Sequence, residues 1–573
     1  MSELAKNNGM LERNLDIVWD LINKQQAKAA TAACEQLNRA YPKSDDGWFA
    51  TSFLAFQLRN GPLALQTIEK ALAIAPNNIR WVLHKAHILT VLGGQHAQYR
   101  KQALALVDGL CENEAVLNSD DANYCVELAM VLNLLSCYQA SAKFYQQAID
   151  LTPQLSSTGS FRGQLYFNLA SIKRYLGDIA SAINHLDTAI ELNPNDSEAY
   201  LLRSSLTKQT PESNHIPELR RLVTQLESQV AARQRHPLSL TQAYYALAKE
   251  QEDLQEFQHS FTSLQRGASL RRKHMKYDVQ NELNTLQTII KVYDKAFFEQ
   301  AFVDHPMTGS SIASDKPTPI FILGLPRTGS TLIERIVSSH SDVHSCGELN
   351  HFAMQMMQLV KDNRQDGATN EHVVPASAQI DFAKLGEAYI NSVLESETLP
   401  DNTDGNTPRY FIDKLPLNSL YIGLIRLALP DAKIIHVKRH PLDTCYAIYK
   451  QLFTSGYPFS YDLAELAQYY IAHHELMEHW QAVLPDVMYQ INYEDVVDDV
   501  YGQAQKLIAH CGLDWQNACA SFEKNAAPST TASASQVRQG IYKSSKYRWQ
   551  RYQQQLEPVR NTLEKAGISC DIR

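Results

Sequence analysis

The chain has 573 residues, 44% of them hydrophobic and 20% charged, with a formal net charge of −9 at pH 7. This length exceeds one ordinary hydrophobic core and predicts two to four domains. The negative charge disfavours nonspecific binding to nucleic acid. No apolar run is long enough to cross a bilayer, and the N-terminus lacks a secretory signal pattern. The nine cysteines form no CxxC pair, so we expect reduced thiols, a cytoplasmic location and no metal site.

The first half of the chain is repetitive. Pro42 and Pro76 are 34 residues apart, which is the period of a tetratricopeptide repeat. Ser52 and Ala64 then occupy the small positions at which the two helices of a hairpin approach each other. A degenerate late repeat is indicated by Tyr244, Leu247 and Ala248. We therefore predict a tetratricopeptide α-solenoid over residues 1–300, with a plain helical bundle as the alternative.

The pattern changes after residue 300. Residues 304–319 are polar and contain proline, glycine and serine. This composition predicts a linker, which we assign to residues 301–318. In residues 319–573, short apolar runs such as PIFILG (319–324) and KIIHVKR (433–439) alternate with segments of helical periodicity. This alternation predicts a parallel α/β sheet.

The stretch GLPRTGST, residues 324–331, lies between a predicted strand and a predicted helix. Such a turn directs backbone N–H groups and a helix N-terminus at an anion. A nucleoside triphosphatase needs lysine after the second glycine, but here Ser330 and Thr331 follow Gly329. The positive charge lies inside the loop at Arg327, and arginine grips tetrahedral oxyanions with two hydrogen bonds. The loop therefore suits a phosphosulfate and disfavours a nucleotide kinase or triphosphatase.

Five motifs follow one another in the second half: LPRTGSTLIERIVSSHSDVHSCGEL, FIDKLPLN, IIHVKRHPLDTCYA, INYED and SASQVRQGIYKSSKYRW. Together they resemble sulfotransferases that use 3′-phosphoadenosine 5′-phosphosulfate (PAPS). The pattern is most similar to bacterial tetratricopeptide-repeat sulfotransferases and tyrosylprotein sulfotransferases. The resemblance implies a P-loop-like parallel α/β domain, PAPS as co-substrate and no metal.

The resemblance also implies roles for single residues. Glu348 matches a general base, and Lys414 matches a lysine that binds the bridging oxygen of the donor. Ser533 lies where a serine approaches the sulfuryl group. An acceptor hydroxyl needs a base within hydrogen-bond reach, and a buried glutamate would qualify. The nearby His344 and His351 are the alternative bases, while His340 completes a histidine group without a tidy metal-ligand pattern.

Nucleotide binding is assigned in the same way. The phosphosulfate loop comprises Arg327, Thr328, Gly329, Ser330 and Thr331. Arg439 matches the arginine that grips the 3′-phosphate, Tyr493 a tyrosine near the adenosine, and Arg548 a basic residue that closes over the nucleotide. The family usually has a serine eight residues after this arginine, but here the position is Ala447, so Thr444 or backbone amides are the expected substitutes.

The acceptor is the least determined part of the prediction. The resemblance favours a protein or peptide tyrosine that the repeat groove recruits, since superhelical repeats present concave surfaces to extended peptides. Carbohydrate and small-molecule hydroxyls remain open, as does a homo-oligomer. A repeat scaffold with an inactive nucleotide domain is a further alternative, although Arg327, Glu348, Lys414 and Arg439 are all present.

Overall fold

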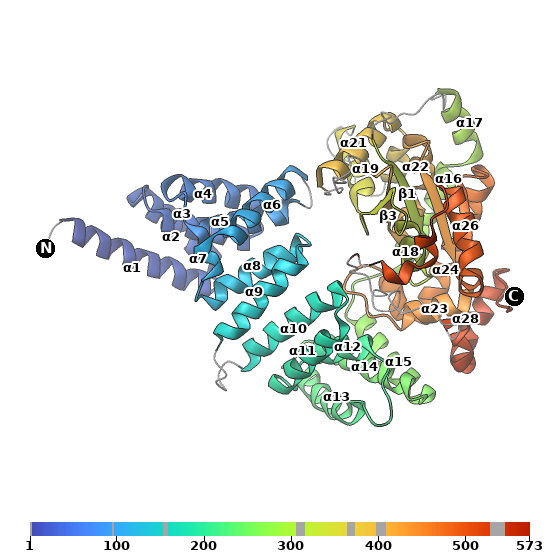
Figure 1. The fold of residues 1–573 in the computed structure, drawn as a ribbon, viewed down its shortest axis with the longest axis horizontal. Helices are drawn as coiled ribbons and strands as arrows, with labels where there is room; N and C mark the ends of the chain where they lie inside the picture. Colours follow the sequence, from blue (N-terminus) through green and yellow to red (C-terminus); the bar gives the residue numbers. More distant parts are fainter. Residues whose placement is uncertain are drawn as a thin grey trace. The chain divides into compact units, whose positions relative to one another are not determined.

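The computed structural model describes residues 3–93, 97–152, 159–304, 316–363, 373–396, 408–525, 527 and 545–572 (Figure 1). The chain forms two compact units, Met1–Ile172 with Ser392–Ser396 and Lys173–Asn391 with Glu397–Arg573. Most of the predicted linker and Ser533 fall outside the described residues. Within the described ranges, every helix is too short or too polar to cross a membrane.

The first unit is built from helices. They are α1 (Glu3–Asn23), α2 (Ala27–Ala40), α3 (Asp45–Gln57), α4 (Gly61–Ile74), α5 (Ile79–Gly93), α6 (Ala97–Glu112), α7 (Glu114–Leu117), α8 (Ala122–Leu134), α9 (Tyr138–Leu151) and most of α10 (Gly159–Leu176). Ser44, Asn60 and Asp121 accept backbone N–H bonds at the starts of α3, α4 and α8. These caps satisfy N–H groups that the helix itself leaves unpaired, and so fix where each helix begins.

The second unit begins with further helices. They are α11 (Ile179–Leu192), α12 (Ser197–Leu206), α13 (Ile216–Ala231), α14 (Pro237–Asp253), α15 (Phe257–Lys273), α16 (Val279–Val292) and α17 (Lys295–Asp304). The hairpin α14–α15 is built like two earlier hairpins, because one hydrogen bond recurs in all three. A serine hydroxyl donates 2.7 Å to an alanine carbonyl of the other helix: Ser52 to Ala64, Ser141 to Ala129 and Ser260 to Ala248. Small residues allow this close approach, as predicted for the repeats.

The rest of the second unit surrounds a five-stranded sheet. The strands are β1 (Thr318–Leu323), β2 (Val343–Ser345), β3 (Tyr410–Lys414), β4 (Lys433–Lys438) and β5 (Met488–Asn492). Their order is β2-β3-β1-β4-β5, and every neighbouring pair is parallel. The predicted fold class, a helical repeat region followed by a parallel α/β domain, is confirmed.

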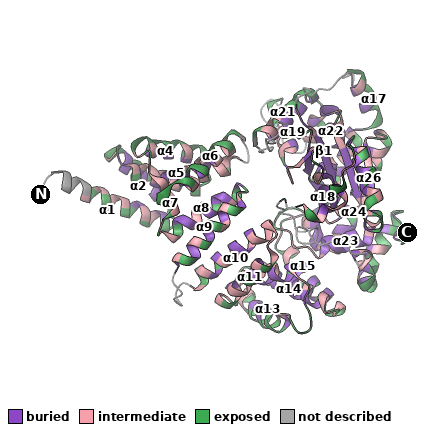
Figure 2. Ribbon diagram, viewed as in Figure 1, coloured by how far each residue is buried: buried purple, intermediate pink, exposed green. Residues whose placement is uncertain are grey.

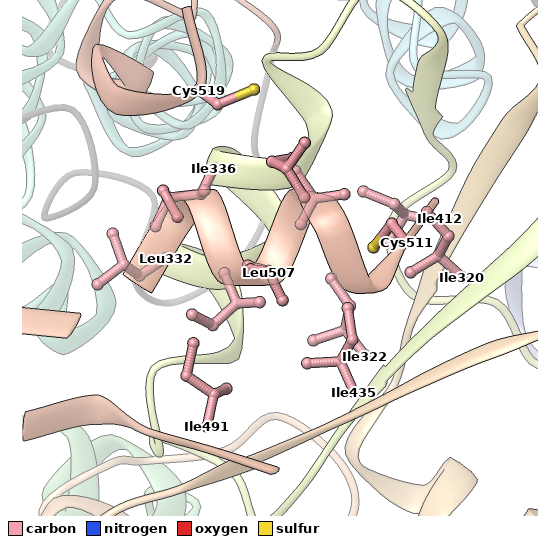
Figure 3. Close-up of a cluster of buried hydrophobic side chains, with 14 of the residues drawn as sticks. Ile320, Ile322, Leu332, Ile336, Ile412, Ile435, Ile491, Leu507, Cys511 and Cys519 are labelled. Carbon is pink, nitrogen blue, oxygen red and sulfur yellow. The ribbon is translucent and has the colours of Figure 1, made fainter. Parts of the chain in front are cut away.

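Helices cover both faces of the sheet. They include α18 (Ser330–Ser338), α19 (His351–Asp362), α20 (Val373–Ser377), α21 (Phe382–Ser396), α22 (Ile422–Ala428), α23 (Pro441–Tyr449), α24 (Leu463–Val483), α25 (Tyr493–Asp498), α26 (Val500–His510) and α28 (Gln553–Lys565). On one face, Ile320 and Ile322 of β1 pack with Leu332 of α18 and Leu507 of α26 (Figure 3). On the other face, Phe321 stacks on Tyr389 of α21 with ring centroids 5.6 Å apart. Because successive strand residues point to opposite faces, β1 is buried on both sides (Figure 2).

The hairpin α14–α15 packs directly on the α/β domain. The Tyr245 hydroxyl donates to the Tyr449 carbonyl at 3.3 Å, and the ring of Phe261 lies 6.0 Å from that of Tyr449. Phe261 also contacts Tyr552, whose ring centroid is 5.7 Å away. All four aromatic side chains are buried. Packing is therefore continuous between these repeat helices and the domain that carries the candidate site.

Candidate active site

The predicted phosphosulfate loop joins β1 to α18 in a tight turn. Gly324, Arg327 and Gly329 have positive φ angles of 138°, 67° and 105°. A β-carbon at Gly324 would lie 2.5 Å from the Val437 carbonyl oxygen, and one at Gly329 would lie 2.5 Å from the Tyr493 ring. Glycine is therefore required at both positions for conformation and for space. The loop is pressed against β4 on one side and against Tyr493 on the other.

The helix that follows the loop offers an anion site. Gly329 is the N-cap of α18, and the helix begins with Ser330 and Thr331, whose side chains are buried. The first N–H groups of a helix lack intrahelical acceptors and lie at the positive end of its dipole. The Thr328 hydroxyl donates to the Leu325 carbonyl at 2.8 Å, so this side chain holds the loop in shape.

Lys414 lies at the carboxyl end of β3, opposite Ile322 of β1, and its side chain is only 1% exposed. Its ammonium group donates to Glu348, the predicted base, and lies 3.9 Å from Glu334 Oε2. The structure thus joins the two predicted catalytic residues. The Glu348 side chain is 51% exposed.

Glu334 was not among the predicted site residues. It lies on α18, is buried, and accepts a 2.6 Å hydrogen bond from the Ser345 hydroxyl. A carboxylate in this position gives the buried Lys414 a second partner. The sequence did carry a signal, since Glu334 is acidic within the otherwise apolar face formed by Leu332, Ile333, Ile336 and Val337.

Asp413 precedes Lys414 and faces the other side of the sheet. It accepts hydrogen bonds from the Tyr389 hydroxyl at 2.9 Å and from the Asn418 amide at 3.1 Å. Burial raises the pKa of Asp413 to about 7, although these two hydrogen bonds oppose the shift. This network fixes the carboxyl end of β3, and therefore the point from which Lys414 extends.

Arg439 follows β4 and reaches the same loop. Its guanidinium group donates to the Arg327 carbonyl at 3.2 Å and to the Ser545 carbonyl at 2.9 Å. It lies 3.4 Å from Asp443 Oδ2 and 4.9 Å from the centre of the Tyr493 ring. Among the described residues, its buried Nε has no hydrogen-bond partner. Arg439 and Tyr493 are thus brought together at the loop, with one donor of Arg439 still available.

Position 447, where the family usually has a serine, is alanine here and offers no polar group. Ala447 is buried on α23, and the Thr444 hydroxyl is hydrogen-bonded to the His440 carbonyl at 3.1 Å. The Thr444 hydroxyl therefore donates its hydrogen bond to the backbone next to its own helix.

The segment that carries Arg548 is hydrogen-bonded to α23, close to Arg439. The backbone N–H groups of Tyr547 and Trp549 donate to the buried carboxylate of Asp443 at 2.6 and 3.0 Å. Asp443 therefore holds both Arg439 and the short helix η8 (Arg548–Tyr552). Asp443 was not among the predicted site residues either, because its partners in this segment are more than 100 residues away.

The histidines that lie near Glu348 in the sequence have different surroundings. The His340 ring is buried between the Asp514 carbonyl, at 2.9 Å, and the Asp342 backbone N–H, at 3.1 Å. Burial lowers the pKa of His344. Within the described part of the chain, no three His, Cys, Asp or Glu side chains are grouped in a way that could hold a metal ion.

Comparisons with known families agree with this architecture. Residues 319–517 match the model of the sulfotransferase family, and residues 163–196 match a tetratricopeptide repeat. An uncharacterized protein of Aquifex aeolicus (strain VF5) is 32% identical over 330 residues, which cover 56% of this chain and 41% of that protein. The match thus spans less than half of this relative. The predicted combination of a repeat region and a sulfotransferase domain is confirmed.

Solved structures with similarity include both kinds of module. The sulfotransferase domain of the Synechococcus PCC 7002 olefin synthase is 19% identical, with a TM-score of 0.29, and the match covers 42% of this chain and 90% of that one. A thermophilic TPR protein of Thermus thermophilus is 17% identical, with a TM-score of 0.27, and the match covers 34% of this chain and 97% of that one.

Proposed function

We propose that this chain, which joins a tetratricopeptide repeat to a sulfotransferase-family domain, transfers a sulfuryl group from PAPS to an acceptor hydroxyl. The observation that carries the proposal is the buried ammonium group of Lys414, in contact with Glu348 at the edge of the sheet where the anion-binding loop lies. A scaffold with an inactive domain would have no need for such a costly buried cation beside that loop.

The residues present fit PAPS. The loop and the N-terminus of α18 would hold the 5′-phosphosulfate, with Arg327 as a cation within the loop. Arg439, with its available Nε, would bind the 3′-phosphate. Tyr493 lies beside Arg439 and beside Gly329 of the loop. Ser330 stands where a triphosphatase needs lysine, which argues against hydrolysis of Mg·ATP.

When bound, PAPS supplies an activated sulfuryl group whose bond to the bridging phosphate oxygen breaks as the bond to the acceptor oxygen forms. The attacking and leaving oxygens lie on opposite sides of the sulfur in an in-line transfer, a geometry we carry over from phosphoryl transfer. Glu348 and Lys414 touch each other in the structure. In the proposed reaction they would separate and lie on opposite sides of that sulfur. Glu348 would accept the acceptor's proton, and Lys414 would stabilise the negative charge on the leaving oxygen.

Glu334 explains how Lys414 can change partners. When Glu348 turns toward the acceptor, Lys414 loses its closest carboxylate. Glu334 remains 3.9 Å away, and its own position is fixed by Ser345. A buried cation without any partner is strongly destabilising, so this second carboxylate holds Lys414 in place.

For the acceptor we propose a phenolic hydroxyl, as in a protein or peptide tyrosine. Burial raises the pKa of Tyr457, and the negative charge of the Glu348 carboxylate raises it further. The rings of Phe453 and Tyr457 lie 4.9 Å apart. Aromatic rings pack favourably with other aromatic rings, so this pair would pack against the ring of a phenolic acceptor. Recruitment of a protein acceptor by the repeats belongs to the same proposal, and the cytoplasmic location stays a prediction.

The test is mass spectrometry of acceptors after incubation of the full chain with PAPS. Tyrosine peptides, serine peptides and a panel of sugars would be compared for a sulfuryl adduct, with Lys414→Met as the inactive control. We expect the adduct on tyrosine and its loss in the control. An adduct on sugars alone would overturn the acceptor assignment, and no adduct on any hydroxyl would overturn the proposed activity.

A further inference from the structure

A short strap, residues 545–549, is fastened to the part of the site that holds Arg439. The Ser545 carbonyl accepts a hydrogen bond from the Arg439 guanidinium group at 2.9 Å, and the Ser545 hydroxyl accepts one from the Tyr493 hydroxyl at 2.9 Å. The centre of the Tyr493 ring lies 4.9 Å from the same guanidinium group. Ser545, Tyr493 and Arg439 therefore form a closed group in which each residue contacts the other two.

Asp443 fastens the other end of the strap. Its side chain is only 1% exposed, and it accepts hydrogen bonds from the backbone N–H groups of Tyr547 at 2.6 Å and Trp549 at 3.0 Å. The oxygen that binds the Tyr547 N–H, Oδ2, also lies 3.4 Å from a terminal nitrogen of Arg439. One buried carboxylate thus joins the strap to the cation.

The strap contains an unfavourable backbone conformation. Tyr547 has a φ angle of 55°, in the left-handed region that residues with a β-carbon rarely adopt. Such a conformation persists only where the surrounding structure holds it. The Trp549 ring stacks on the ring of His440, with centroids 5.3 Å apart and planes at 9°. This stack and the two hydrogen bonds to Asp443 together hold the strap against the start of α23.

The charge of Asp443 is opposite to the one that binding of a phosphate requires. The proposed function assigns the 3′-phosphate to Arg439, and a carboxylate oxygen 3.4 Å from that cation repels a phosphate beside it. If Asp443 acted only through its charge, neutralising it would strengthen the binding of the 3′-phosphate. If it acts by holding the strap and Arg439 in place, neutralising it would weaken that binding.

The contacts of Arg439 favour the second explanation. One terminal nitrogen donates to the Arg327 carbonyl at 3.2 Å, and the other contacts both the Ser545 carbonyl and Asp443. The buried Nε has no hydrogen-bond partner among the described residues. Contacts at both terminal nitrogens fix the plane of the guanidinium group, and therefore the direction in which Nε can donate.

We propose that Asp443 is a positioning residue of the 3′-phosphate site, which orients Arg439 by fastening the strap against it. The inference rests on the proposed function and deepens it, because it adds the strap to the part of the site that distinguishes nucleotides with a 3′-phosphate from those without one.

The test is calorimetry of the full chain with 3′,5′-adenosine bisphosphate and with 5′-AMP, which lacks the 3′-phosphate. Asp443→Asn removes the charge at constant size, and the amide cannot accept both backbone hydrogen bonds in the same way because one of its ends is itself a donor. We expect the affinity for the bisphosphate to fall about tenfold and the affinity for 5′-AMP to stay within about twofold.

A double-mutant cycle separates positioning from general support of the fold. In a chain that already carries Arg439→Ala, Asp443→Asn should cause less than about a twofold further loss, because residues that act through one another are not additive. Asp462→Asn is the matched control, since Asp462 also accepts two backbone N–H groups, those of Ala464 and Glu465, at 2.9 and 3.1 Å. This control should bind both nucleotides as the unaltered chain does, and thermal unfolding would show whether each variant is folded.

Tyr493→Phe releases the strap at its other end. It removes the hydroxyl that donates to Ser545 and leaves the ring beside Arg439. We expect a loss of about threefold for the bisphosphate, the size of one neutral hydrogen bond, with little change for 5′-AMP. This variant decides the question if Asp443→Asn does not fold.

Three kinds of result would overturn the inference. Tighter binding of the bisphosphate by Asp443→Asn would show that Asp443 acts only through its charge. Equal losses for both nucleotides, or a full loss that persists in the Arg439→Ala chain, would show that Asp443 supports the fold and not Arg439. Unchanged affinities in Asp443→Asn, or in Tyr493→Phe where Asp443→Asn does not fold, would remove the strap from the site. If the unaltered chain bound neither nucleotide, the proposed function itself would fail, a result distinct from these three.

Discussion

The two strands that flank β1 end in different kinds of charged group. On the β3 side, Lys414 is paired with two carboxylates, one of which is half exposed. On the β4 side, Arg439 is held by backbone carbonyls and by the buried Asp443. A partner that can turn away allows a cation to change its contacts during a reaction, whereas a cation fixed by the backbone can only bind. The β3 side is therefore suited to chemistry and the β4 side to affinity.

The β4 side also depends on the repeats, and removing them should produce the largest effect. A chain that begins at Pro317 would expose Tyr449 and Tyr552, which are buried against Phe261. Each large apolar side chain that loses its cover costs roughly 1.5–3 kcal/mol of unfolding free energy. We expect this chain to show no cooperative thermal unfolding, while a chain that begins at Lys173 unfolds cooperatively. Cooperative unfolding of the shorter chain with normal nucleotide binding would contradict this dependence.

The β3 side should control the rate. Glu348→Gln keeps the shape of the side chain but removes its basicity, so turnover should fall by about 10²–10⁴-fold with little change in nucleotide affinity. A carboxylate base works only when unprotonated, so this variant should also lose the acidic limb of the pH–rate profile. Lys414→Ala should lower turnover and retain that limb, because the role that we propose for Lys414 is to stabilise the leaving oxygen. Near-normal turnover of Glu348→Gln would exclude it as the base and favour His344 or His351.

The β4 side should control affinity. Arg439→Ala removes the charge-assisted contact that we propose with the 3′-phosphate, and such a contact is worth about 1.5–3 kcal/mol. Calorimetry should show this loss with 3′,5′-adenosine bisphosphate and almost none with 5′-AMP. Since Arg439 also donates to the Arg327 carbonyl, equal losses for both nucleotides would mean that it mainly supports the loop.

The smallest effect concerns the anchoring of β3. The pKa of Asp413 is about 7 in the folded chain, above its ordinary value of 3.8, so the folded state binds this proton more tightly than the unfolded state does. Its contribution to stability is therefore present in acid and is lost as the pH rises from about 4 to about 7. Comparison of unfolding free energies across this range should show the unaltered chain losing stability relative to Asp413→Asn. A difference that is independent of pH would contradict the raised pKa.

The sequence predicted what depends on local patterns. The strand, glycine turn and helix around Arg327 could be read from apolar runs and glycine spacing, and the repeats from proline spacing and small residues. The sequence could not predict contacts between residues that are far apart in the chain. Lys450 and Glu252 are 198 residues apart, and nothing in either segment indicates that they meet. The exposure of Glu348 could not be predicted either, because burial is decided by the fold around a residue and not by its neighbours in sequence.

In the proposed function, the loop, Lys414 and Arg439 together form a site for PAPS. Calorimetry of the full chain with 3′,5′-adenosine bisphosphate, in the absence of Mg²⁺, tests it most directly, with Mg·ATP as the competitor. We expect metal-independent binding of the bisphosphate that is tighter than the binding of Mg·ATP. Tighter binding of Mg·ATP, or no binding of the bisphosphate, would contradict the account.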